Sequence, residues 1–350
     1  MTIHDGVLIT GANGYIAEYI IDHLLQENYV VIGTVRNKSK ADKIMKLFNY
    51  SPDLKIVVIP DLTIPHVFRD IFIQYQNQIE YVIHTAGPLG FDYTNIYEEV
   101  IRPSVEGTLN LMRDISRYGG ESIKKFILTS SSSAIEHPDG YVNNKSIHTE
   151  ETWPSITQSE GCKNAVNGYY ASKTFAEKEA WNFYKQGNLK NCKMCSINPD
   201  YVMGPRLFDE EVVDVNSLNY SLQVINEFMD VGLDYKIDDR PMGRCIDVRD
   251  VTRAHIMAME NDSFIDKRIV LSNEIFSEPL ILQYLYDEIP ELHGKIPNPS
   301  KTIIQKSPKS DENRVVDVDY SKSAKLLNFQ YIPLRQSVAD TGKQLLKLYK

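Results

Sequence analysis

Two patterns of apolar and polar residues alternate along the first half of the chain. Short, mainly apolar runs occupy residues 7–10, 30–35, 56–59, 81–85 and 125–129. Amphipathic stretches of helical period lie between them and occupy residues 15–27, 40–48, 66–75 and 96–118. Continuously apolar runs are typical of strands buried on both faces, so the alternation predicts a parallel sheet with helices on both sides. This is an α/β fold of the Rossmann type, doubly wound, which binds ligands beyond the carboxyl ends of its strands.

The pattern continues to about residue 200 and then becomes irregular. A helix is predicted over residues 168–184 and a strand over residues 193–197. Prolines and glycines interrupt the later part, in which a strand at residues 244–248 and a helix at residues 251–260 stand out. We predict two parts from this change. Residues 1–200, with about 244–260, form the nucleotide-binding domain, and residues 201–243 and 261–350 form a smaller C-terminal substrate-binding lobe.

Composition and charge narrow the class of protein. The 350 residues are 42% hydrophobic and 24% charged, which is ordinary for a globular enzyme. The formal net charge of −9 argues against a nucleic acid as the main partner, because an acidic chain gains nothing from counterion release. The longest apolar runs are strand-sized, and residues 1–5 lack the basic start of a signal peptide. We therefore expect a cytoplasmic protein that does not bind membranes.

The cysteines raise the question of a metal or redox site. Cys192 and Cys195 form a C-x-x-C pair, but the other cysteines, Cys162 and Cys245, supply no second pair for zinc. Residues three apart on a strand point to opposite faces of a sheet. We therefore expect buried free thiols and no metal.

A glycine-rich turn connects the first strand to the first helix. Its sequence is Gly11-x-x-Gly14-x-x-Ala17. The first glycine permits a tight turn, the second lets the backbone approach a pyrophosphate, and the helix N-terminus offers free N–H groups. This context favours dinucleotide binding over a purely structural turn. The expected contacts come from Gly11, Ala12, Asn13, Gly14, Tyr15 and Ile16.

The end of the second strand distinguishes NADP(H) from NAD(H). NAD sites usually carry an acid there for the ribose 2′-hydroxyl, whereas this chain has Arg36, followed by Lys38 and Lys40. A guanidinium binds a 2′-phosphate that a carboxylate would repel, so we predict NADP(H) as the cofactor. The alternative is a solvated basic turn. Asp61, after the third strand, suits either the adenine amino group or the cap of the following helix.

A tyrosine and a lysine four residues apart form the candidate catalytic pair. Tyr169 and Lys173 share one face of the predicted helix. An ammonium within a few Å favours the phenolate and allows proton transfer near neutral pH. Serines at positions 130–133 follow the strand at 125–129 and face the same cleft. Taken alone, Y-x-x-x-K is most often a surface helix pair and a serine run a polar turn, but their combination with the glycine loop favours catalysis.

These motifs together resemble the extended short-chain dehydrogenase/reductase superfamily. Further motifs carry the resemblance, namely His84-Thr-Ala, Leu128-Thr-Ser-Ser131, Asn198-Pro-x-Tyr-Val-x-Gly-Pro205 and Ile246-Asp-Val-Arg-Asp250. Within the superfamily the chain most resembles the fungal NADPH-dependent aldehyde and ketone reductases that reduce methylglyoxal or isovaleraldehyde. Plant dihydroflavonol and cinnamoyl-CoA reductases are similar to a lesser degree. The likeness extends over nearly the whole chain.

The resemblance implies a role for each part of the site. Ser131 would be the catalytic serine and Tyr169 the proton donor in reduction. Lys173 would bind the nicotinamide ribose and lower the pKa of Tyr169, so Tyr169 and Lys173 also count as cofactor contacts. Arg36 and Lys40 would bind the 2′-phosphate. The remaining implied cofactor contacts are Asp61 and Leu62 at the adenine, Thr85, Pro199 and Val202 near the nicotinamide, and Ser221.

The substrate side follows from the same resemblance. It would be lined by Leu89, Phe91, Ser132, Glu136 and Tyr201. Glu136 departs from the aromatic or apolar residue expected there. If Glu136 faces the pocket, it disfavours anionic substrates; otherwise it points to solvent.

The sequence thus predicts NADPH-dependent reduction of a small carbonyl compound. An NAD-containing epimerase on the same scaffold is an alternative, which Arg36 disfavours and which tightly bound NAD in the purified protein would reveal. A non-catalytic NADP-binding protein is another, disfavoured by the complete Ser–Tyr–Lys set. A monomer and a homodimer are both compatible with the sequence.

Overall fold

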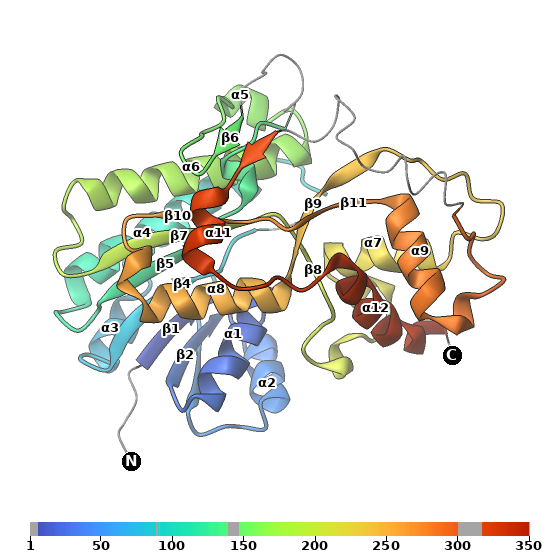
Figure 1. Cartoon of the computed structure of the whole chain (residues 1–350). Coiled ribbons are helices and arrows are strands. Elements are labelled where there is room, and N and C mark those ends of the chain that lie inside the picture. Colours follow the sequence, from blue (N-terminus) through green and yellow to red (C-terminus); the bar gives the residue numbers. More distant parts are fainter. Residues whose placement is uncertain (1–5, 89, 91, 139–146, 300–316, 350) are drawn as a thin grey trace.

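A large parallel sheet forms the core of the molecule (Figure 1). The computed structural model describes residues 6–88, 90, 92–138, 147–299 and 317–349. The seven strands of the sheet run in the order β10-β7-β5-β4-β1-β2-β3. Their bounds are β1 Gly6–Thr10, β2 Val30–Val35, β3 Leu54–Val58, β4 Ile79–His84, β5 Lys125–Thr129, β7 Lys193–Pro199 and β10 Arg268–Leu271. The predicted doubly wound α/β fold is confirmed.

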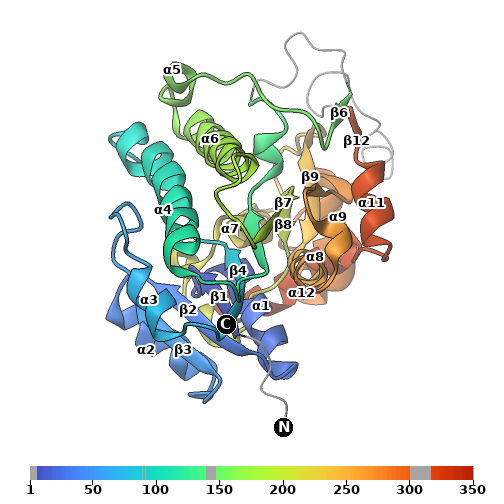
Figure 2. The ribbon, with the colours of Figure 1, turned by 90° about the vertical axis from the view of Figure 1, so that its left-hand side faces the viewer.

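Helices cover both faces of this sheet, and each face has its own apolar core. One core packs under α1 Tyr15–Gln26, α2 Lys38–Leu47 and α8 Val248–Glu260. The other packs under α3 Arg69–Gln74, α4 Arg102–Tyr118 and α6 Ala165–Lys185. Figure 2 shows α4 and α8 on opposite sides of the strands. The strands read as continuous apolar runs because they are buried on both faces.

A smaller lobe lies beside the carboxyl ends of the strands (Figure 1). Its three-stranded sheet has the order β11-β9-β8. The strands are β8 Tyr201–Met203, β9 Pro241–Asp247 and β11 Glu274–Ser277. The helices packed in its core are α7 Tyr220–Met229, α9 Glu278–Glu288 and α12 Leu334–Leu345. Other short elements include α5 Gln158–Gly161, the paired strands β6 His148–Thr149 and β12 Val318–Asp319, and α11 Ser321–Leu327.

The structure shifts some of the predicted boundaries. The prediction placed residues 261–350 in the lobe, yet β10 pairs with β7 in the large sheet, and α11 packs against β10. The pairing is long-range, so the local pattern gave no sign of it. The predicted helix at 66–75 is regular only from Arg69, where a carboxylate oxygen of Asp114 accepts a hydrogen bond from the Phe68 N–H.

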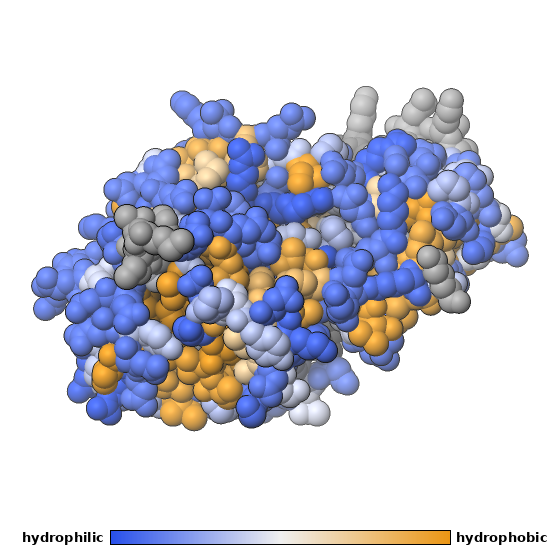
Figure 3. Space-filling view, turned by 90° about the horizontal axis from the view of Figure 1, so that it is seen from below, coloured by the Kyte–Doolittle hydropathy of each residue, from blue (hydrophilic) through white to orange (hydrophobic). Residues whose placement is uncertain are grey.

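The face of the molecule seen from below is mixed in character (Figure 3). Figure 3, a view from below, shows apolar side chains gathered in several patches between hydrophilic ones. Among the described helices, none combines the length and the apolar character that crossing a membrane requires.

Candidate active site

A cavity of about 1160 Å³ opens at the carboxyl ends of the strands. Residues that follow β1, β2, β4, β5 and β7 line one side of it, and residues of the smaller lobe line the other. Most of the residues singled out in the sequence meet there. They are Gly11, Asn13, Gly14, Tyr15, Ile16, Arg36, Lys40, Leu62, Thr85, Ser131, Ser132, Glu136, Tyr169, Lys173, Pro199, Tyr201, Val202 and Ser221. Ala12 and Asp61 do not line the cavity, and Leu89 and Phe91 lie outside the described residues.

The glycine loop forms a cradle at the start of α1. Gly11 has a φ of 71°, a conformation that favours glycine, and a Cβ there would lie 3.0 Å from the Ala86 Cα. Gly14 is the N-cap of α1, and no side chain caps this helix end. The first N–H groups of α1 are therefore directed at the cavity without a side-chain acceptor, as an anion site requires.

Ala12 has a structural role in the loop. Its side chain is fully buried, and its N–H donates to the Thr34 carbonyl at 2.9 Å. A Cβ on Gly33 would lie 2.7 Å from the Ala12 Cβ, so the small residue in β2 lets the loop pack on the sheet. The N–H of Ala12 is thus already bonded and is not available to a phosphate.

The basic turn after β2 faces the cavity with two cations. Within the described part of the chain, the Arg36 and Lys40 side chains make no ion pair, whereas Lys38 pairs with Asp42 at 3.4 Å. The Asn37 side chain caps α2 by accepting from the Lys40 N–H at 2.9 Å. The turn therefore holds Arg36 and Lys40 at the cavity wall with their charges available to a 2′-phosphate.

Asp61 and Leu62 separate in the structure. One Asp61 oxygen accepts from the N–H of Thr63 at 2.8 Å and from its hydroxyl at 2.7 Å. These bonds lower the pKa of Asp61. Leu62 lines the cavity, while its carbonyl accepts from the Asn110 side chain at 3.0 Å. Asp61 thus stabilises the turn after β3, although α3 begins too far along the chain for Asp61 to be its cap.

Tyr169 and Lys173 lie one turn apart on α6, with the Lys173 Nζ 5.8 Å from the centre of the Tyr169 ring. A Cβ on Gly87 would approach that Nζ to 3.7 Å, so the loop after β4 passes close to the ammonium. Burial, and secondarily the Lys173 charge, lower the pKa of His84 to about 3. His84 is therefore neutral, and its ring bonds to the hydroxyls of Thr10 at 2.6 Å and Thr108 at 3.1 Å.

The next residue fixes the loop after β4. The Thr85 hydroxyl donates to the Thr10 carbonyl at 2.5 Å, and Thr85 lines the cavity. The ends of β1 and β4 are thereby held together beside the glycine loop.

The serine turn contains residues with different surroundings. The Ser130 hydroxyl donates to the buried carboxylate of Glu177 at 2.6 Å, so it serves the scaffold. Ser131 is the N-cap of a short 3₁₀ helix, Ser132–Ala134, where its oxygen accepts from the Ser133 N–H at 3.1 Å. The Ser131 carbonyl accepts from the Asn198 side chain at 3.1 Å. Ser131 thus lines the cavity, with its carbonyl held by Asn198 and its hydroxyl bonded to Ser133.

The lobe contributes an aromatic wall to the substrate side. The Tyr201 ring lies 5.3 Å from that of Phe276 and 5.8 Å from that of Tyr220, centre to centre. Ser221 follows on α7, and its hydroxyl accepts from the Asn219 side chain at 3.2 Å. Tyr220 and Phe276 were not predicted, because no motif marks them and only the folded lobe brings them to the cavity.

Charged side chains lie on the same side. Glu136 does line the cavity, and its carboxylate accepts from the Tyr320 hydroxyl at 2.9 Å. Asp200 and Arg244, which were not predicted from the sequence, line the cavity as well. Burial, followed by the charge of Asp200, raises the pKa of Glu136 to about 7. The only sequence signal for Asp200 and Arg244 was their position inside or next to a motif.

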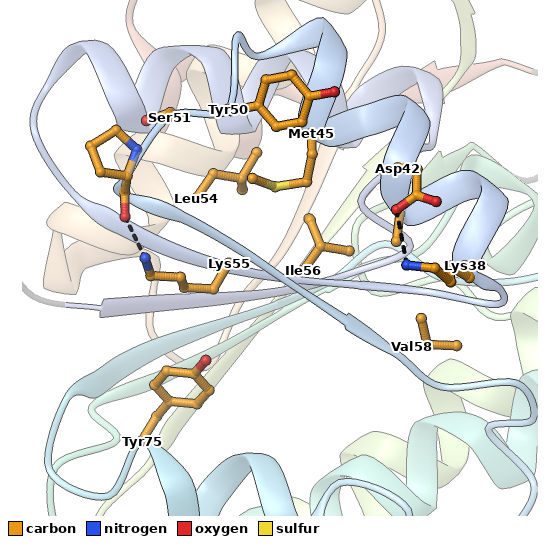
Figure 4. A pocket seen from close by; sticks show the side chains of 12 residues that line it. Lys38, Asp42, Met45, Tyr50, Ser51, Leu54, Lys55, Ile56, Val58 and Tyr75 are labelled. Carbon is orange, nitrogen blue, oxygen red and sulfur yellow. Dashed lines mark hydrogen bonds and ion pairs between the residues drawn. The ribbon is translucent and has the colours of Figure 1, made fainter.

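A second hollow of about 570 Å³ lies over the outer strand β3 (Figure 4). Met45, Leu54 and Ile56 form its apolar floor, and the Lys38–Asp42 pair stands at its edge. None of the predicted catalytic or cofactor residues lines this hollow, which is therefore separate from the large cavity.

The C-x-x-C cysteines diverge. Cys195 packs in the core beneath α1 and α8, and Cys192 in the core on the opposite face of the sheet. Burial raises the pKa of each thiol to about 12, which disfavours the thiolate that metal binding or thiol exchange needs.

The fold and the cavity define a dinucleotide-binding enzyme of the Rossmann class. Residues 7–271 match the model of the NAD dependent epimerase/dehydratase family, and the chain belongs to this family. It is 34% identical over 344 residues to the NADPH-dependent methylglyoxal reductase GRE2 of Saccharomyces cerevisiae, covering 97% of this chain and 98% of that protein.

Two solved structures are similar over almost their entire length. Gre2 of Candida albicans in complex with NADPH has a TM-score of 0.90 and 34% identity, covering 99% of this chain and 100% of that one. The yeast methylglyoxal/isovaleraldehyde reductase Gre2 in complex with NADPH has a TM-score of 0.88 and 33% identity, covering 98% and 99%.

Proposed function

We propose that this protein is an NADPH-dependent carbonyl reductase that converts aldehydes or ketones to alcohols. The observation that carries the proposal is that one cavity is lined by the glycine loop, the basic turn at Arg36 and the set Ser131, Tyr169 and Lys173. The similar proteins of Saccharomyces cerevisiae and Candida albicans support the same activity, since the first is a methylglyoxal reductase and the second was solved with NADPH.

The residues present fit the cofactor. The cradle that a Cβ on Gly11 would fill, and the uncapped start of α1, suit a pyrophosphate. Arg36 and Lys40 suit the additional phosphate of NADPH, and this favours a reductase over an epimerase that retains NAD. When bound, NADPH supplies the hydride that the reduction requires.

The chain's own residues supply alignment and a proton. The Ser131 hydroxyl donates a hydrogen bond to the substrate's carbonyl oxygen and holds it beside Tyr169. The Tyr169 hydroxyl gives its proton to that oxygen as negative charge develops there. The Lys173 ammonium stabilises the resulting phenolate and binds the nicotinamide ribose. The partner is thus a small carbonyl compound, and we propose a cytoplasmic location, in which the free cysteines stay reduced.

Replacing Tyr169 tests the proton transfer. Tyr169→Phe should lower kcat at least about 100-fold, because general acid catalysis contributes that much or more. NADPH should still bind, with a dissociation constant within a few-fold of wild type by fluorescence titration. Tyr184→Phe is the matched control, since the Tyr184 hydroxyl on the same helix donates to Asp266 at 2.6 Å instead of lining the cavity. Near-normal turnover of the Tyr169 variant would refute the mechanism.

A further inference from the structure

The substrate side of the cavity contains charges that the proposed reduction does not use. Glu136, Asp200 and Arg244 all line it. The hydroxyls of Ser272 and of Ser132, the residue after the proposed catalytic serine, face Asp200 and counter part of the rise in its pKa that burial causes. The cluster of Glu136, Asp200 and Arg244 therefore adjoins the position at which the proposed mechanism holds the substrate's carbonyl oxygen.

Acidic groups predominate in this cluster. The Arg244 charge acts on both Glu136 and Asp200, so among the residues that the structure describes, one cation faces two carboxyl groups here. The Tyr320 hydroxyl donates to one oxygen of Glu136 at 2.9 Å. Burial is the main reason that the pKa values of both carboxyl groups are raised. Ionised carboxylates here are poorly compensated, and a hydrogen-bond donor entering the cavity would stabilise them.

Acceptor capacity remains in the cluster. Within the described part of the chain, no hydrogen bond reaches the second carboxylate oxygen of Glu136, and Glu136 is only partly buried. The Oδ2 atom of Asp200 is buried and has no hydrogen-bond partner among the described residues, although the Asp200 side chain is 8% exposed and borders the cavity. The neighbouring wall of Tyr201 and Phe276 is aromatic and supplies mainly apolar surface.

From this arrangement we infer that the enzyme selects carbonyl compounds with a hydrogen-bond-donating group, a hydroxyl or an ammonium, close to the carbonyl. Glu136, supported by Asp200, recognises that group, while Ser131 and Tyr169 hold the carbonyl oxygen. Carboxylate substituents are disfavoured because they would face two acidic side chains against one arginine. This inference rests on the proposed function and names its substrate class.

A series of four ketones that differ in one substituent tests the selection. Butanone, hydroxyacetone and aminoacetone carry a methyl, a hydroxyl and an ammonium on the methylene next to the carbonyl, and pyruvate carries a carboxylate directly on the carbonyl carbon. Their dissociation constants are measured on the enzyme–NADP⁺ complex, where no hydride is available, and kcat/KM is measured with NADPH. Because carbonyl reactivity differs among the ketones, each variant is compared with wild type on the same ketone.

Two substitutions of Glu136 separate hydrogen bonding from charge. Glu136→Leu should weaken binding of hydroxyacetone and aminoacetone about tenfold or more and leave butanone within a few-fold. Glu136→Gln keeps an acceptor oxygen, so hydroxyacetone should lose little while aminoacetone loses about tenfold. Pyruvate should bind more tightly to both variants. Glu151→Gln, an exposed acid paired with Lys322 at 3.2 Å, is the control and should change none of these values.

Two results would contradict this selection of substrates. Equal losses for butanone and hydroxyacetone would show that Glu136 only shapes the cavity, and tightest binding of pyruvate, abolished by Arg244→Leu, would show an anion site instead. Either result overturns the inference. If the predicted binding order holds and no ketone is reduced, the proposed function fails while the recognition stands.

Discussion

At the scale of the residue, the carboxyl group of Glu136 should make stability depend on pH. Burial and Asp200 raise its pKa to about 7, with Arg244 and Tyr320 as the other groups that face it. A raised pKa means that the folded protein binds a proton more tightly than the unfolded chain. Glu136 therefore adds stability at low pH, and this stability disappears as the pH rises from about 4.5 to 7.

Glu136→Gln should remove that dependence. Between pH 5 and 8, the unfolding free energy of wild type minus that of the variant should fall by about 1–3 kcal/mol, measured by urea denaturation at each pH. Carboxyl groups outside the cluster of Glu136 and Asp200 cancel in the difference, including Asp250, whose pKa burial raises to about 6. A difference that stays flat, or rises, would show that Glu136 is not protonated in the folded protein near neutral pH.

Individual site residues were predictable where their signal is local. Tyr169 and Lys173 followed from the spacing of a helix, and Gly11 from the turn that joins a strand to a helix. The cluster at Glu136 was not predictable, because the contact of Glu136 with Tyr320 spans 184 positions of the chain. Asp61 shows that a local signal can fit more than one role. Its position after β3 suits an adenine contact, but in the structure its carboxylate accepts two hydrogen bonds from Thr63, two residues further along the chain.

At the scale of the element, α6 joins Tyr169 and Lys173, the proposed catalytic pair, to the scaffold. Glu177 lies one turn after Lys173 and is fully buried. Its carboxylate accepts from the hydroxyl of Ser130 at 2.6 Å and from the side chain of Asn198 at 2.7 Å. The Arg268 guanidinium donates to it at 2.7 Å. Burial alone would raise the pKa of Glu177, but Arg268 and the hydrogen bonds hold it below its ordinary value.

Glu177 thereby positions the serine turn, since Asn198 also donates to the Ser131 carbonyl. Glu177→Gln should reduce stability by about 3–5 kcal/mol, because it leaves Arg268 without its buried anion. The value of kcat should fall, whereas the KM for NADPH should change by a smaller factor, because the turn at Ser131 loses the hydrogen bonds that hold it in position. Urea denaturation and steady-state kinetics measure both effects.

Glu179→Gln is the control on the same helix. Glu179 is exposed, so its replacement should change stability by no more than about 0.5 kcal/mol. A Glu177 variant that is as stable and as active as this control would exclude a positioning role. The predicted helix at residues 168–184 contains only one of the partners of Glu177, Trp181. The other partners lie just after β5 and on β7 and β10.

At the scale of the molecule, Arg206 connects the two parts of the chain that enclose the cavity. Its guanidinium donates to Glu18 of α1 at 2.8 Å and to Glu211. Its backbone N–H and carbonyl both bond to the Gln344 side chain of α12, at 2.7 and 2.9 Å. Lys43 of α2 completes the network at 2.8 Å from Glu211. Sequence patterns give no sign of it, because its members come from four distant segments.

Removing Arg206 should therefore loosen the lobe and the phosphate cradle together. Arg206→Met leaves Glu18 and Glu211 buried without their main cation, so the unfolding free energy should fall by about 3–5 kcal/mol. Lys43→Met is the matched control, since the Lys43 side chain is 56% exposed and its loss should cost less than about 1 kcal/mol. Urea denaturation without cofactor measures both.

The affinity for NADPH should show whether the Arg206 network also supports the cofactor site. Because α1 begins at the cradle, loosening its contact with Arg206 should also raise the dissociation constant of NADPH, by several-fold in titrations of folded protein. A cofactor concentration of 100 times the dissociation constant stabilises a protein by about 2.7 kcal/mol, so saturating NADPH should restore a large part of the loss. If NADPH binds Arg206→Met as tightly as wild type, the network only holds the lobe in place. The stability of the lobe would then be independent of the cofactor site.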